Sequence, residues 1–129
     1  MAGRKSVPLQ LRLKHARESL EDAKSLLVEN VGTNFVMNSL YYSFLFTLFG
    51  LLEARGISSP EQDKVICLFE REYVLTGQIE TRFLDGIRKA FDLRPACDCQ
   101  GKRVVTVKDL EQLLPIADEL LVLAERFAA

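Results

Sequence analysis

The chain has 129 residues with 17 basic and 18 acidic side chains, so its formal net charge is −1. This balance excludes recruitment of nucleic acid by overall charge, and any phosphate-binding site must be a local basic cluster. The length predicts one domain over residues 1–129 that folds without disulfides. The three cysteines, an odd number, favour a reducing compartment. No apolar secretory segment follows the first basic residues, so we expect a cytoplasmic protein.

A first helix is predicted from about Val7 to Val31, because leucine and alanine recur there at spacings of three and four. The apolar stripe consists of Leu13, Ala16, Leu20, Ala23 and Leu27. Charged side chains occupy the other positions, which is typical of an amphipathic helix with a solvent-exposed face. Gly32 is the expected C-terminal stop, and Thr33 is the expected N-cap of the next helix.

The second helix, predicted from about residue 33 to residue 55, is apolar on nearly every side. It carries no charged side chain between Glu29 and Glu53. A helix of this kind must be covered by protein or by lipid. Its strongly apolar part covers only residues 40–52, which is shorter than the roughly 20 residues that a bilayer span needs. We therefore expect a central core helix and no membrane segment.

A third helix is predicted to start at Ser59-Pro60-Glu61-Gln62. Ser59 is the expected cap, Pro60 the first helical residue, and Gln62 the partner that completes a capping box. Apolar residues at helical spacing follow, and Gly77 is the expected stop.

A fourth helix is predicted from about Ile79 to Arg94, just before Pro95. Residues 97–105 are expected to form a loop. Thr106 with Asp109 indicates the start of a last helix, which Pro115 should bend. Five helical segments without a strand pattern predict an all-α, up-and-down helical bundle of about five helices.

Candidate metal ligands and nucleophiles are few in this sequence. Cys97 and Cys99 have CxC spacing, but a structural zinc site usually needs four Cys or His ligands. The other candidates, Cys67 and His15, belong to different predicted helices. No pattern pairs His15 with a cysteine as a nucleophilic site, and a solvent-facing position is the simpler interpretation of His15. We expect no bound metal and no cofactor.

The remaining candidate lies at the end of the fourth helix, where Arg94 precedes Asp98 by one helical turn. Two interpretations stay open. Arg94 is either a structural residue that compensates the helix dipole, or a phosphate ligand that acts through its planar guanidinium. Lys102 and Arg103 could enlarge a basic cluster there. Tyr42 on the central helix is either a packing residue or a stacking surface for a base.

An ordered set of segments extends from about Leu11 to Phe127. It consists of residues 16–23 (ARESLEDA), Tyr41-Tyr42 with residues 51–57 (LLEARGI), residues 65–69 (VICLF) with Thr76-Gly77, and residues 90–94 (AFDLR) with Asp98. In this set the chain resembles the HEPN family (higher eukaryotes and prokaryotes nucleotide-binding domain), in its small stand-alone prokaryotic branch.

The resemblance implies a helical bundle that forms a homodimer and acts with a minimal nucleotidyltransferase as its protein partner. Many such proteins look like RNA-cleaving toxins that need no metal ion and use one cleft between two protomers. The family pattern would make Arg94 and Asp98 the catalytic residues, with Asp98 orienting Arg94 on a phosphate. Tyr42, Lys102 and Arg103 would then help to bind RNA or a nucleotide.

The chain departs from the family pattern at three positions. Cys99 stands where tyrosine is expected, Ser39 where arginine often precedes the tyrosine pair, and Gln62 where histidine often occurs. The best general acid or base at neutral pH is then missing from the proposed cleft, and an aspartate with a pKa of about 4 is a poor substitute. Activity as a metal-independent endoribonuclease therefore stays open.

Two functional hypotheses follow. The first is a toxin-like or RNA/nucleotide-binding partner of a minimal nucleotidyltransferase, in a toxin–antitoxin-type pair. The second is a non-catalytic dimeric helical interaction protein with a degenerate ribonuclease site.

Overall fold

The computed structural model describes the backbone of residues 2–58, 60–93 and 104–128, and the side chains between residues 9 and 127 within these ranges. These residues form four longer helices and one composite helical segment. The longer helices are α1 (Ala2–Glu29), α2 (Thr33–Glu53), α4 (Thr81–Leu93) and α5 (Val107–Ala128). The described ranges contain no strand, so the predicted all-α helical bundle is confirmed.

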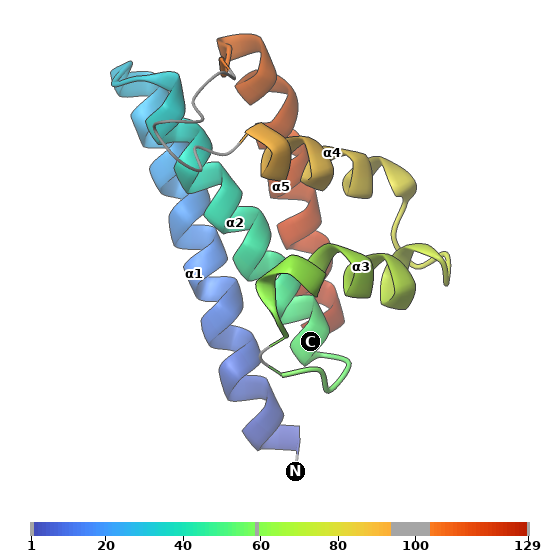
Figure 1. Cartoon of the computed structure of the whole chain (residues 1–129). Coiled ribbons are helices and arrows are strands. Elements are labelled where there is room, and N and C mark those ends of the chain that lie inside the picture. The colour runs from blue at the N-terminus through green and yellow to red at the C-terminus, as the bar shows by residue number, and fades with distance from the viewer. Residues whose placement is uncertain (1, 59, 94–103, 129) are drawn as a thin grey trace.

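The helices α1 and α2 run side by side in opposite directions, and α5 packs against both of them (Figure 1). The shorter α4 packs against α2 and α5, the composite segment packs against α2, and both project to one side (Figure 1). Among the described helices, α2 alone contacts each of α1, α3, α4 and α5. Its central position follows from its composition, because a helix that is apolar all round gains most when every face is covered.

By length and hydropathy α2 could cross a membrane, so its burial decides between the two interpretations. In the structure 67% of its most apolar window is buried inside the protein. Leu40, Phe44, Leu48 and Leu51 are each at most 1% exposed. The interpretation of α2 as a core helix therefore accounts for its apolar composition.

The predicted stop of the first helix was wrong by two residues. Helix α1 ends at Glu29, and Asn30 adopts a left-handed conformation with φ of 57°. The Asn30 amide donates to the Leu27 carbonyl at 3.1 Å, and the Val31 amide to the Leu26 carbonyl at 3.4 Å. This is a Schellman ending, in which asparagine is the common substitute for glycine.

The next helix start also differs from the prediction. Gly32, with φ of 133°, is the N-cap residue of α2, and Thr33 is already its first helical residue. The helix start has no side-chain cap. The expected Thr33 cap is therefore wrong, because the turn after Asn30 places the chain in helical geometry one residue earlier.

The composite segment consists of a 3₁₀ turn η1 (Gln62–Lys64), the short helix α3 (Val65–Phe69) and a π-helical turn η2 (Glu70–Val74). Pro60 precedes the segment, so its predicted place as the first helical residue is wrong, and the predicted cap Ser59 lies outside the described residues. Gly77, with φ of 80°, ends this region as predicted: its amide donates to the Val74 carbonyl at 3.0 Å.

The predicted start of the last helix is confirmed. The Asp109 amide donates to the Thr106 hydroxyl at 3.1 Å, and the Thr106 amide donates to the Asp109 carboxylate at 3.1 Å. This reciprocal pair satisfies two free N–H groups at the start of α5. Pro115 lies inside α5, while α4 begins at Thr81, two residues later than Ile79.

Candidate functional site

The first half of α2 packs against the last turn of α4 through two aromatic rings. Tyr41 is 3% exposed, and its ring meets the ring of Phe91 edge-on, with the centroids 4.8 Å apart. Phe91 lies three residues before Arg94 in the sequence. This contact packs the last turn of α4 against the first half of α2.

Gln62 joins the same cluster from the composite segment. Its side-chain amide donates a hydrogen bond to the Tyr41 hydroxyl, and the start of the segment has no side-chain cap. The expected capping role of Gln62 is therefore wrong, because its side chain reaches across to α2. Gln62, which stands where the family pattern often has histidine, thus contacts Tyr41 of the tyrosine pair.

Tyr42 follows Tyr41 but lies on an accessible face of α2, where it is 41% exposed. Its ring stacks on Phe46 at 6.1 Å and meets Tyr41 edge-on at 5.1 Å. Tyr42, Phe46 and Phe49, at positions i, i+4 and i+7, form a row along α2 that we call the aromatic row. The spacing of these residues could have revealed the row from the sequence alone. The sequence could not show that the row is partly exposed.

Two side chains of α1 border the aromatic row. His15, the single histidine of the chain, meets Phe46 edge-on at 5.5 Å, and the guanidinium carbon of Arg12 lies 4.9 Å from the ring centre of Phe49. His15 is half-buried, so it is less solvent-facing than expected. A half-exposed row of rings beside a cation can stack on bases or cover another apolar protein surface.

Four of the predicted site residues lie outside the described ranges, namely Arg94, Asp98, Lys102 and Arg103. Their proposed roles stay predictions. The described residues before this gap end at Leu93, close to the Tyr41–Phe91 contact, and those after it begin at Val104, just before α5. Tyr42 is therefore the predicted binding residue whose place the structure gives.

No group of three or more His, Cys, Asp or Glu side chains in the described ranges could hold a metal ion. Cys67 is exposed on α3, while His15 packs on Phe46 of α2. Cys97 and Cys99 lie outside the described residues. The described residues thus offer neither a metal site nor a Cys-His pair.

Comparison with known proteins adds three findings. The model of the HEPN domain family matches residues 9–127. A protein of Thermotoga maritima named "UPF0332 protein" is 33% identical over 85 residues, which cover 66% of this chain and 64% of that protein. A protein of Methanocaldococcus jannaschii named "Putative toxin MJ0142" is 23% identical over 106 residues, which cover 82% of this chain and 71% of that protein. The chain thus spans less than two thirds of the length of the Thermotoga protein.

Proposed function

The chain belongs to the HEPN family, and from this premise we propose that it is a toxin-like, RNA- or nucleotide-binding module that acts with a minimal nucleotidyltransferase in the cytoplasm. The name of the Methanocaldococcus relative supports the toxin-like part of this proposal. The observation that carries the binding part is the exposed ring of Tyr42, which adjoins the Tyr41–Phe91 contact in the last described turn of α4.

In this proposal Arg94 donates parallel hydrogen bonds from its guanidinium to a phosphate of RNA. Asp98 accepts a hydrogen bond from Arg94 and thereby holds the guanidinium in place. Lys102 and Arg103 add positive charge, and Tyr42 stacks on a base. Since the whole chain carries a net charge of −1, the affinity has to come from this local cluster.

Cleavage without a metal ion requires the RNA 2′-oxygen to lose its proton and bond to the adjacent phosphorus, while the bond to the 5′-oxygen breaks and that oxygen takes up a proton. Arg94 can stabilise the negative charge that develops on the phosphate. The weak point is the group that removes the 2′-hydroxyl proton, because an aspartate carboxylate, with a reference pKa of about 4, is a weak base near neutral pH. We therefore propose that binding is the primary activity and that cleavage, where it occurs, is slow.

The test is binding and cleavage of single-stranded RNA by the wild type and by Arg94→Ala. Loss of a charge-assisted contact to phosphate should weaken binding by about ten-fold or more, as measured by fluorescence anisotropy. The matched control is Arg88→Ala, which removes an exposed arginine of α4, paired with Glu70 at 3.3 Å. Equal affinities for the wild type and Arg94→Ala would remove Arg94 from the site.

The second hypothesis, a non-catalytic dimeric interaction protein, is favoured by large apolar side chains on the surface. Val28 is 85% exposed, Phe35 65% and Leu11 50%. Such side chains are candidates for burial in a dimer or against a protein partner. Light scattering should then give twice the 14.6 kDa of one chain. A stable complex with the protein encoded by the neighbouring gene, together with no RNA binding or cleavage, would select this hypothesis.

A further inference from the structure

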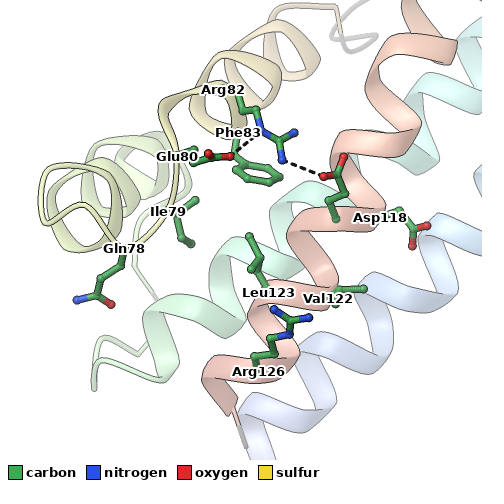
Figure 2. Close-up of a pocket in the computed structure, with 10 residues that line it drawn as sticks. Gln78, Ile79, Glu80, Arg82, Phe83, Asp118, Val122, Leu123 and Arg126 are labelled. Carbon is green, nitrogen blue, oxygen red and sulfur yellow. Dashed lines mark hydrogen bonds and ion pairs between the residues drawn. The ribbon is translucent and has the colours of Figure 1, made fainter.

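A groove of about 410 Å³ lies at the beginning of α4, at the opposite end of this helix from Phe91 (Figure 2). One wall is formed by residues 78–83, which lead into α4 and make its first turn. The other wall is formed by two turns of α5, residues 118–126. The volume falls in the range of about 300–1,000 Å³ that is usual for small-molecule sites.

The apolar part of the groove comes mainly from α5. Val122 is 40% exposed, and Leu123 is half-buried and points from α5 towards Ile79 and Phe83 (Figure 2). Ile79 and Phe83 are only 3% and 1% exposed, so they form the buried layer beneath the surface of the groove. A ligand in the groove would therefore contact Val122 and Leu123 with an apolar body.

The acidic side chains that line the groove all have partners within the chain. Arg82 donates to Glu80 and to Glu119, in both cases at 2.8 Å (Figure 2). Asp118 pairs with Arg17 at 3.2 Å and with Lys24 at 3.8 Å. Each of these carboxylates thus has a basic partner, and the contacts occupy two nitrogens of the Arg82 guanidinium.

Arg126 differs from the other charged residues of the groove. It is exposed, and it makes no ion pair or hydrogen bond with any described residue. It follows Val122 by four residues, so both side chains lie on the same face of α5. The groove thus combines a small apolar surface with one guanidinium at its edge that has no partner among the described residues. A ligand with one negative charge and an apolar body is complementary to this arrangement.

We propose that the groove between α4 and α5 binds a small amphipathic monoanion, such as a carboxylate with an aliphatic or aromatic body. The anionic group accepts hydrogen bonds from the Arg126 guanidinium, and the apolar body lies on Val122 and Leu123. This site involves neither Arg94 nor the aromatic row, so it stands independently of the proposed RNA-binding function.

The probe for this site is 1-anilinonaphthalene-8-sulfonate, an aromatic monoanion whose fluorescence rises in apolar surroundings. We expect saturable binding to the full chain, displacement by octanoate, and much weaker displacement by octanamide, which has the same chain length without the charge. Displacement by octanamide as effective as that by octanoate would contradict the proposal, because Arg126 recognition requires an anion.

Two variants test the assignment of the residues. Arg126→Gln should weaken probe binding about ten-fold, as expected for one charge-assisted hydrogen bond, and Val122→Asp should weaken it further by placing a negative charge on the apolar surface. Both side chains are exposed, so the fold should be retained. The matched control is Lys108→Gln, which removes a positive charge from the first turn of the same helix and should leave binding unchanged.

The following results would contradict the proposal. Equal binding by the wild type and Arg126→Gln, or an equal loss in Arg126→Gln and Lys108→Gln, would show that Arg126 does not anchor the anion. Absence of probe binding to the wild type would also overturn the proposal, and it is the result expected if the groove receives a protein segment instead.

Discussion

Ser43 connects α2 to α1 through a buried hydrogen bond. Its hydroxyl donates to the Ala16 carbonyl at 2.9 Å, and the side chain is 0% exposed. One turn later the Thr47 hydroxyl donates to the Ser43 carbonyl at 2.7 Å. Both buried hydroxyls are therefore satisfied, which allows an almost entirely apolar helix to carry two polar residues on its buried face.

The first prediction concerns this bond. Ser43→Ala should lower the free energy of unfolding by about 1 kcal/mol, the usual net contribution of one intramolecular hydrogen bond, measured by urea denaturation. The control is Ser39→Ala, one turn earlier on α2, where the side chain is only half-buried and has no hydrogen bond to any described residue. A loss in Ser39→Ala as large as that in Ser43→Ala would show that the contact to α1 is not what stabilises the protein.

At the level of the helix, the start of α5 is stabilised by groups from two elements. Asp109 accepts a hydrogen bond from the Thr106 amide within the turn, and it pairs with Lys89 of α4 at 3.1 Å. The Thr106 amide, followed by the Lys89 ammonium, lowers the pKa of the Asp109 carboxyl below its ordinary value. One ionised side chain therefore takes part both in the capping of α5 and in a contact between α4 and α5.

The lowered pKa gives a pH-dependent prediction. The stabilisation by ionised Asp109 is fully present above its unfolded-state pKa of about 4, and it is lost as the pH falls through the lower folded-state pKa. Asp109→Asn should therefore lower the melting temperature at about pH 7 and have a smaller effect at about pH 2. Glu111→Gln, two residues later on the exposed face of α5, is the control. An equal effect of Asp109→Asn at both pH values would mean that the ionisation of Asp109 does not contribute to the stability of the protein.

For the whole molecule, stability depends on covering α2. The buried apolar side chains of all five helical segments form one continuous core, and Leu48 lies in it with 0% exposure. The packing of α4 against α2 and α5 helps to close this core, and the groove lies where the start of α4 meets α5. Core and groove are thus consequences of one arrangement.

Leu48→Ala should lower the free energy of unfolding by about 2–5 kcal/mol. This is a large part of the roughly 5–15 kcal/mol available to a typical domain, so the variant should be close to unfolding. Leu75→Ala makes the same chemical change at a side chain that is 74% exposed and should change stability by less than about 0.5 kcal/mol. Similar urea midpoints for the two variants would show that α2 is not the centre of the core.

The sequence by itself determined the helical segments, the all-α class and the role of α2 as the core helix. These features depend on apolar spacing and on local stop signals such as Gly77, and both act within a few residues of backbone. The HEPN resemblance was also a property of the sequence, since it rests on residue types at matching spacings, and the family match confirms it.

Only the tertiary structure decided which distant side chains meet. It brought Gln62 to Tyr41 instead of to a helix cap, placed His15 on Phe46, and left Arg126 beside a groove without an ion pair to any described residue. It also selected Asn30 over Gly32 as the end of α1. The physical reason is that such contacts depend on the angle and the register at which helices pack, which are set by side chains from several elements at once, while periodicity specifies only the buried face of each helix.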